Sequence, residues 1–306
     1  MDYIILAKVF ESLEKEQSYL KKTEILSEFL QKYKDEDLEH IVLLLQGDVF
    51  SRYENKELGI GLELIKKSIA TSTGYELKDV EKKFKQSGDL GSLVYDLISK
   101  KRQSTLFSET LTTKKVFENL RAVYEINGAK SQERKLNLIS ELLTVATPLE
   151  GKFIIRTILG DLRIGIAEGR LKDAISKTFN IDETIIDRAI MLTNDFPYVC
   201  SVAAKEGENG LLNISMIFNR PVSPMLAQGS KDLSDILERM PTAAYEYKLD
   251  GMRMQIHLSK ESTKIFTRRF DDITGAFPDV VSALSETITA ESVILDGELV
   301  AYSPPK

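Results

Sequence analysis

The stretch EYKLDGMRMQIHL, from Glu246 to Leu258, decides how the last third of this 306-residue chain folds. Its second half alternates apolar and polar residues, which is typical of a strand with one buried face. The aromatic-rich residues 243–248 come before a short turn at Leu249–Gly251, so the segment predicts a hairpin of two strands. Lys248 would then sit at the tip of a rigid hairpin.

A lysine held in this way is a candidate nucleophile. Partial burial and neighbouring cations raise the fraction of neutral, attacking amine near pH 7. Lys-x-Asp-Gly is short and also occurs by chance. From this stretch alone, a hairpin that carries scattered surface charges is therefore the favoured interpretation.

Two later stretches add to the pattern. They are IFTRRFDDITGAFPDV at Ile265–Val280 and VILDGELVAY at Val293–Tyr302. With Lys248 they follow the order and spacing of the first nucleotidyltransferase motifs, and the whole chain resembles the ATP-dependent DNA ligases, most closely the archaeal and eukaryotic replicative type. The resemblance implies a multidomain α and α+β protein. An all-helical DNA-binding domain would be followed by an incomplete nucleotidyltransferase (adenylation) domain, ATP-grasp-like with an antiparallel sheet.

The resemblance also implies roles for single residues. Lys248 would be the catalytic nucleophile, and ATP with Mg²⁺ would be bound near it. Glu246 matches the residue that contacts adenine, Arg253 and Arg268 match arginines that reach ribose and phosphate, and Glu298 matches a ribose contact. Arg269 adjoins Arg268, and the sequence leaves open which of the two points inward.

The implied function is sealing of single-strand nicks in duplex DNA through lysyl-AMP, in replication, repair and recombination. We expect a monomer in the cytoplasm, associated with the nucleoid. The chain ends soon after Glu298, so we expect a truncated ligase that is not competent alone. Two alternatives stay open: a DNA- and clamp-binding module without catalysis, and a related RNA ligase or capping-type nucleotidyltransferase.

Composition narrows these classes. A chain of 306 residues with 42% hydrophobic and 29% charged residues is typical of a globular protein with two domains. No apolar run is long enough for a membrane span. The net charge of −6 argues against coating nucleic acid by bulk electrostatics, although a few cations on one face suffice for a duplex. One cysteine and two histidines argue against a zinc site, and we predict no metal ligands in this chain.

Residues 1–219 show helical spacing of apolar residues almost throughout, and Pro221 and Pro224 then break the pattern. We therefore place the domains at 1–219 and 220–306. Within the first, an apolar helix stopped by Gly-Asp and followed by L-x-I-G occurs twice, which predicts a degenerate duplication. The first copy matches Gly61 with Gly165 of the second.

Each copy would start a helix with free N–H groups that suit a phosphate. Two such turns about a pseudo-twofold axis would touch both sides of a duplex, and glycines that merely allow close helix packing are the alternative. The second copy resembles the signature of the ligase DNA-binding domain. The predicted DNA contacts are Gly61, Arg156, Arg163, Gly165 and Arg170.

A further motif, QSTLF, lies between basic and polar segments. Gln103, Leu106 and Phe107 resemble the short motif by which archaeal ligases dock on the sliding clamp, although this copy has a single aromatic. The resemblance implies a sliding clamp as a partner. Burial of Leu106 and Phe107 in the domain's own core is the alternative.

Overall fold

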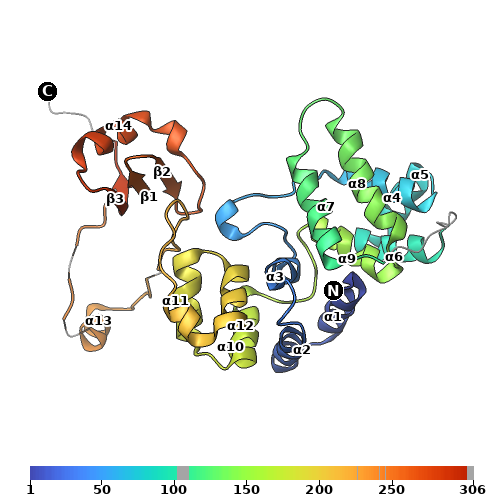
Figure 1. Ribbon diagram of the computed structural model, residues 1–306, viewed down its shortest axis with the longest axis horizontal. Helices are drawn as coiled ribbons and strands as arrows, with labels where there is room; N and C mark the ends of the chain where they lie inside the picture. Colours follow the sequence, from blue (N-terminus) through green and yellow to red (C-terminus); the bar gives the residue numbers. More distant parts are fainter. Residues whose placement is uncertain (102–109, 226, 241, 245, 302–306) are drawn as a thin grey trace. The chain divides into compact units, whose positions relative to one another are not determined.

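The computed structural model describes residues 1–101, 110–225, 227–240, 242–244 and 246–301 (Figure 1). The chain divides into two compact units. One comprises Met1–Ile190 and Asp195–Ile214, and the other comprises Met191–Asn194 and Ser215–Lys306. Within the described residues, no helix has both the length and the apolar character needed to cross a lipid bilayer.

The first unit is helical, as the spacing of apolar residues predicts. In α1, Tyr3, Leu6, Phe10 and Leu13 line one buried face, and the Phe10 ring packs 5.0 Å from that of Phe153. The helices of the described chain here are α1 (Tyr3–Lys15), α2 (Tyr19–Lys32), α3 (Leu38–Gln46), α4 (Leu62–Thr73), α5 (Leu77–Ser87), α6 (Leu90–Ser99), α7 (Thr113–Glu125), α8 (Ser131–Val145), α9 (Pro148–Ile158), α10 (Glu168–Phe179), α11 (Glu183–Thr193) and α12 (Phe196–Leu212), with a 3-10 turn η1 at Arg52–Glu54.

The order of helices α1–α6 recurs in α7–α12, and α4 and α10, like α5 and α11, have equal lengths. Helices α3 and α9 end in the same way, with a left-handed glycine (φ 78° at Gly47, 65° at Gly160) followed by an aspartate. The N–H of Asp48 bonds the carbonyl of Leu43 at 3.0 Å, and that of Asp161 bonds the carbonyl of Arg156 at 3.0 Å. Both ends are thus the same C-terminal capping motif.

The later part of the repeat corrects the register predicted from the sequence. Gly59 and Gly165 share a positive φ (56° and 63°), and α4 and α10 each begin three residues after them. The counterpart of Gly165 is therefore Gly59, and Gly61 corresponds to Ala167. The L-x-I-G pattern misleads because it matches letters, whereas the recurring feature is a left-handed backbone position. Later pairs with positive φ agree: Gly74 with Asn180, and Gly88 with Asn194.

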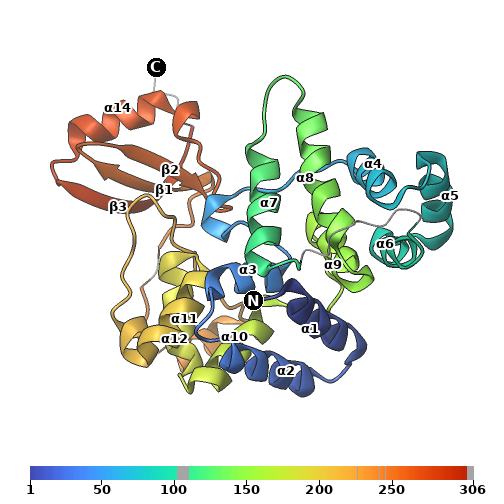
Figure 2. The same cartoon turned by 45° about the vertical axis from the view of Figure 1, so that its right-hand side comes forward.

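The two repeats exchange their packing partners. Helix α6 packs on α9, and its counterpart α12 packs on α3. In the same way α4 packs on α8, and α10 packs on α2 (Figure 2). Most of the core therefore lies between the repeats rather than inside either one.

The second unit holds an antiparallel sheet of three strands in the described residues, in the order β2-β1-β3. The elements are α13 (Leu233–Arg239), β1 (Met252–Ser259), β2 (Thr263–Thr267), the 3-10 turn η2 (Thr274–Ala276), α14 (Pro278–Thr287) and β3 (Ser292–Leu299). Met254, Ile256, Leu258 and Ile265 form the core on one sheet face, against Val281 and Leu284 of α14. The alternation predicted for β1 is confirmed.

The described part of residues 243–248 does not form the first strand of the predicted hairpin. The described residues between Thr242 and Asp250 have no strand assignment, and Tyr247 is 97% exposed. The physical reason lies in the pairing: β1 is the central strand, so β2 and β3 occupy both of its edges. Apolar character at 243–248 signals burial, but a strand also needs an edge to pair with.

Candidate functional site

The strand register places four charged residues on one face of the sheet. Arg253 of β1 pairs with Glu298 of β3, and its neighbour Gln255 pairs with Asp296. The β1–β2 ladder ends at Met254 and Thr267, so Arg268 follows next to Arg253. This is the face opposite the apolar core, because alternate residues of a strand point to opposite sides.

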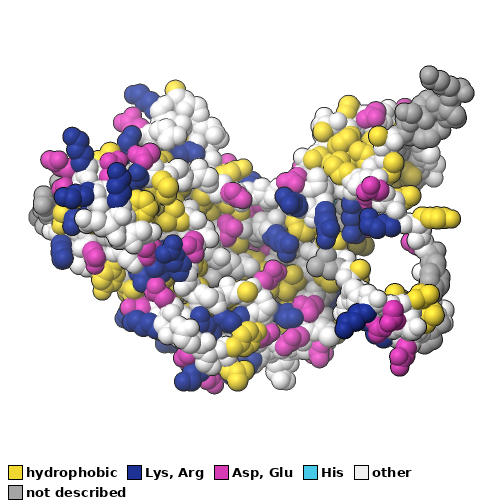
Figure 3. All heavy atoms as spheres, turned by 180° about the vertical axis from the view of Figure 1, so that it is seen from behind, with side chains coloured by type: hydrophobic (Ala, Val, Ile, Leu, Met, Phe, Trp, Pro, Cys, Tyr) yellow, Lys and Arg dark blue, Asp and Glu magenta, His cyan; other side chains and the backbone are white. Residues whose placement is uncertain are grey.

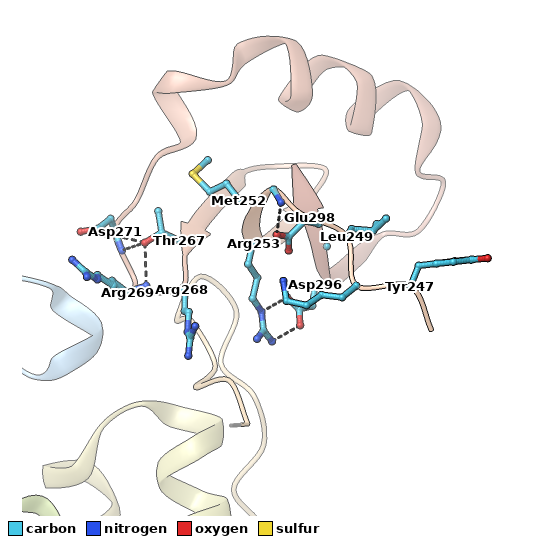
Figure 4. Close-up of a pocket in the computed structure, with 13 residues that line it drawn as sticks. Tyr247, Leu249, Met252, Arg253, Thr267, Arg268, Arg269, Asp271, Asp296 and Glu298 are labelled. Atoms are coloured by element: carbon cyan, nitrogen blue, oxygen red, sulfur yellow. Dashed lines mark hydrogen bonds and ion pairs between the residues drawn. The ribbon is translucent and has the colours of Figure 1, made fainter. Parts of the chain in front are cut away.

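These residues line a cavity of about 950 Å³. Lys248, Arg253, Arg268 and Glu298 all belong to its wall, together with Arg269 and Asp296 (Figure 4). In Figure 4 the Arg268 side chain extends to the same side as that of Arg253, whereas that of Arg269 points away from both. Four of the five residues predicted for nucleotide binding and catalysis therefore meet at one cavity.

A bidentate ion pair holds Arg253. Its Nε lies 2.9 Å from Oδ1 of Asp296, and its Nη2 lies 2.6 Å from Oδ2. The hydrogen bond to Asp296 raises the pKa of the Arg253 guanidinium above its usual value. Asp296 thus fixes the direction of the guanidinium and keeps it positively charged.

Glu298 holds the turn next to Lys248. Its Oε1 accepts a hydrogen bond from the backbone N–H of Gly251 at 3.1 Å. A Cβ at Gly251 would lie 2.3 Å from the carbonyl oxygen of Leu299, so only glycine fits this close approach of two backbones. The Lys-x-Asp-Gly glycine is therefore required by packing against β3.

Two expectations differ from the structure. Lys248 is exposed, whereas the sequence predicts a partly buried lysine at the tip of a rigid hairpin. Glu246 is also exposed and is absent from the described wall of the cavity. Both residues lie in the segment that lacks a strand partner, which explains why they are not packed against the sheet.

The described residues contain no group of three or more His, Cys, Asp or Glu side chains arranged to hold a metal ion. Cys200 is buried, and burial raises the pKa of its thiol to about 12. It is a packing residue of α12.

In the helical unit, Arg156 occupies a different position from the one predicted. It is 3% exposed, and its guanidinium contacts Glu14 (2.9 Å), Asp89 (2.9 Å) and the carbonyl of Leu162 (3.2 Å). All these partners belong to the same unit, and the side chain, including an Nε without a hydrogen-bond partner, is buried away from any phosphate in solution. The expectation that Arg156 contacts DNA is therefore corrected: it joins α9 to α1 and α6.

Two basic side chains donate hydrogen bonds to the backbone carbonyls of the turn around Gly165. Nζ of Lys22, a residue of α2 that is 7% exposed, donates to the carbonyl of Ile164 at 2.6 Å. Arg170 donates to the carbonyl of Gly165 and lies over the ring of Tyr19, 4.4 Å from its centroid. Arg163 is half-exposed and donates to Asp161 at 2.8 Å. These two hydrogen bonds hold the carbonyls of the buried Ile164 and the exposed Gly165 in place.

The N-termini of α4 and α10, which follow the two equivalent turns of the repeats, have no side-chain cap. The N-cap residues are Gly61 for α4 and Ala167 for α10. A groove of about 530 Å³ is lined by Gly47–Asp48 and Glu57–Leu62 of the first repeat and Thr157–Gly160 of the second. On the face shown in Figure 3, Lys and Arg side chains are interspersed with Asp and Glu side chains, and some Lys and Arg side chains lie next to one another.

Comparison with known proteins decides the family. A family model described as DNA ligase N terminus matches residues 2–176, and a model described as ATP dependent DNA ligase domain matches residues 224–306. The chain belongs to the ATP-dependent DNA ligases. It is 40% identical to a DNA ligase of Methanobrevibacter smithii over 301 residues, which is 98% of this chain and 55% of the relative. It is also 41% identical to a DNA ligase of Methanosphaera stadtmanae over 307 residues (99% and 55%) and 39% identical to one of Thermococcus onnurineus over 302 (98% and 54%). The ligase chain spans about half the length of the curated relatives it matches.

Sequence reasoning missed two residues of this ligase chain. Asp296 lies two positions before Glu298 in VILDGEL, so strand alternation alone would have placed both carboxylates on one face. Lys22 gave no signal, because its contact with Ile164 joins residues far apart in the sequence. The predicted clamp residues Gln103, Leu106 and Phe107 lie outside the described residues.

Proposed function

We propose that this ligase chain contributes the nucleophile and the DNA grip of an enzyme that seals single-strand nicks in duplex DNA. The reaction would serve replication, repair and recombination. The observation that carries the proposal is the single cavity whose wall includes Lys248, Arg253, Arg268 and Glu298. A lysine beside two guanidinium groups suits attack on a phosphate ester.

In the proposed first step, Nζ of Lys248 attacks the α-phosphorus of ATP. A P–N bond forms, the P–O bond to pyrophosphate breaks, and the amine loses a proton. Arg253 and Arg268 offset the negative charge of the phosphates, and Asp296 keeps Arg253 directed toward the cavity. AMP then passes to the 5′-phosphate of the nick, and the 3′-hydroxyl displaces it.

The remaining nucleotide contacts rest on the family resemblance. We assign Glu298 to the ribose and Glu246 to the adenine, and Glu246 would have to approach the cavity from its exposed position. ATP in cells carries Mg²⁺, and we include this ion among the requirements. The described residues offer it no cluster of ligands, so no step above is routed through it.

For DNA we propose the two repeated turns as the contact surface. Uncapped starts of α4 and α10 present backbone N–H groups, which suit phosphates and read no sequence. Gly61, Gly165, Arg163 and Arg170 lie in or beside these turns, and Gly59 joins them as the counterpart of Gly165. We also retain the domain limits 1–219 and 220–306, a monomer acting in the cytoplasm at the nucleoid, and a sliding clamp bound through Gln103, Leu106 and Phe107.

Nick sealing by the full-length gene product tests the catalytic proposal. Lys248→Ala should abolish both sealing and the transfer of label from [α-³²P]ATP to protein. The matched control is Lys260→Ala, which removes an exposed lysine of the same unit outside the cavity and should leave both unchanged. Undiminished sealing by Lys248→Ala would remove the mechanism.

The same preparations separate the alternatives. Binding of nicked duplex without any protein adduct would favour a DNA- and clamp-binding module. An adduct formed from GTP, or sealing confined to RNA ends, would favour a capping-type or RNA-joining relative.

A further inference from the structure

A side-chain amide fastens the start of the second unit to β1. Oε1 of Gln255 accepts from the N–H of Val222 at 2.6 Å, and its Nε2 donates to the carbonyl of Val222 at 3.2 Å. These are the two bonds that a neighbouring strand residue would make. Gln255 and Arg253 are two residues apart on β1, so their side chains lie on the same face of the sheet. The extended segment around Val222 is therefore held on the face that carries Arg253.

His257 completes the attachment two residues further along the same face. Its Nδ1 accepts from the backbone N–H of Asn219 at 3.0 Å, so the ring proton must be on Nε2. Nε2 lies 3.1 Å from Oε1 of Gln255, which accepts that proton's hydrogen bond and so fixes which end of the amide faces the histidine.

The surroundings keep His257 in this form. The ring is 0% exposed, with the rings of Phe218 and Phe266 at 5.6 and 5.3 Å. Burial lowers its pKa, which favours the neutral ring that the Asn219 contact needs. Asn219 itself has a φ of 63°, so the chain bends sharply where the histidine holds it.

The segment fixed in this way lines the cavity region. Pro221, Val222 and Pro224 border a small hollow together with Arg253, Gln255 and Arg268. This hollow and the 950 Å³ cavity share Arg253, Thr267 and Arg268 in their walls, so the two lie side by side. The proline segment is thus a wall next to both guanidinium groups.

We propose that Gln255 and His257 are positioning residues of the nucleotide site: they hold residues 219–222 on β1 and thereby keep Pro221 and Pro224 as a wall beside Arg253 and Arg268. The inference rests on the proposed function, because it assigns the wall to ATP binding. Neither side chain needs to touch the nucleotide. Loss of either should weaken ATP binding and leave the chemical step nearly intact.

Kinetics of adenylation by the full-length gene product test this. Gln255→Met keeps the size of the side chain and removes both bonds to Val222, and His257→Phe keeps the ring stack and removes the acceptor for Asn219. Each should raise KM for ATP about tenfold, with kcat within about twofold of the parent. Lys260→Ala again serves as the control. An unchanged KM in both variants would overturn the proposal, as would a loss confined to kcat.

Two further measurements keep the test independent of nick sealing. Chymotrypsin should cut after Phe218 several-fold faster in both variants, because the backbone of Asn219 is released. The chain has two histidines, so ¹⁵N spectra of the parent and of His40→Gln identify the His257 ring. They should show Nε2 protonated and Nδ1 accepting; the opposite tautomer, or averaged nitrogens, would contradict the attachment.

These readouts separate the two failures. If the parent protein forms no adduct with ATP, the proposed function fails, while proteolysis and the ¹⁵N spectra still test the attachment. If the Gln255→Met variant loses helical and sheet signal by circular dichroism, Gln255→Glu replaces it, because Glu keeps the acceptor for the N–H of Val222 and removes only the donor to its carbonyl. Faster cleavage with an unchanged KM would show that the segment is held but is no part of the site, and the proposal would be wrong.

Discussion

Replacement of Arg156 by alanine should destabilise the helical unit without removing a DNA contact. Removing one partner of a buried ion pair costs about 3–5 kcal/mol. Glu14 and Asp89 keep some exposure and retain Lys152 and Ser92 as other partners, so the lower end, about 3 kcal/mol, applies here. With an m-value of about 2 kcal/mol per molar urea, the midpoint should fall by about 1.5 M.

The loss should depend on pH in a defined direction. Partial burial alone would raise the pKa of Asp89, but hydrogen bonds from Ser92 and Arg156 hold it below its ordinary value of 3.8. A carboxyl with a lowered folded pKa stabilises the fold above its unfolded pKa and loses that effect as the pH falls. The difference between parent and Arg156→Ala should therefore be full above about pH 5 and shrink below about pH 4.

Urea unfolding followed by far-UV circular dichroism measures this, since most described helices belong to the unit concerned. Arg163→Ala is the matched control: its side chain is half-exposed, so we expect a loss below about 1 kcal/mol. The reasoning would be refuted if Arg156→Ala left the urea midpoint unchanged but bound duplex DNA more weakly and with less dependence on salt. Arg156 would then be a phosphate contact.

Three further predictions concern other positions. Lys22→Met should release the turn at Ile164 and lower the affinity for nicked duplex several-fold, as measured by fluorescence anisotropy. The dependence of the affinity on salt concentration should not change, because Lys22 contacts a carbonyl rather than a phosphate. Lys21→Met, at the exposed neighbouring lysine, is the control, and a slope of log affinity against log salt reduced by about one would mean that Lys22 itself contacts DNA. Gly165→Ala should lower the free energy of unfolding in urea by about 1 kcal/mol or more, since φ is 63° and a Cβ would lie 2.6 Å from Nζ of Lys22. Gly61→Ala places its Cβ in open space and should change the free energy of unfolding by less than about 0.5 kcal/mol. Equal losses for the two variants would contradict the corrected register. Cys200, whose pKa burial raises to about 12, should resist a thiol reagent at pH 8 until urea unfolds the chain, and rapid native labelling would place it at the surface.

The sequence predicts elements well where one local rule suffices. Helices with apolar residues three and four apart, and the alternation of β1 from Met252, appear as expected because each pattern matches the geometry of a single element. The charged face of the sheet is also largely predictable: Arg253 and Glu298 sit on strands whose pairing follows from their order. Asp296 could have been added by counting two residues back from Glu298.

The errors arise where a residue's role depends on distant partners. Residues 243–248 have the composition of a strand, but no rule within the segment reveals that both edges of β1 are taken. Arg156 is a basic residue within the apolar run of α9, and only the approach of Glu14 and Asp89 from other helices shows that it is internal. Gly61 was matched to Gly165 by letters, whereas the left-handed backbone of Gly59 is a property of the folded turn.

The exchanged packing of the two helical repeats has a consequence for how such a unit could have arisen. A polypeptide with only α1–α6 would leave α2 and α3 without the helices that cover them, and a second identical polypeptide would supply both. The present arrangement is what tandem duplication and fusion of the single gene of a homodimer would produce, with the helix contacts between the two subunits retained inside one chain. A cut between the halves should accordingly yield fragments that fold only on reassembly.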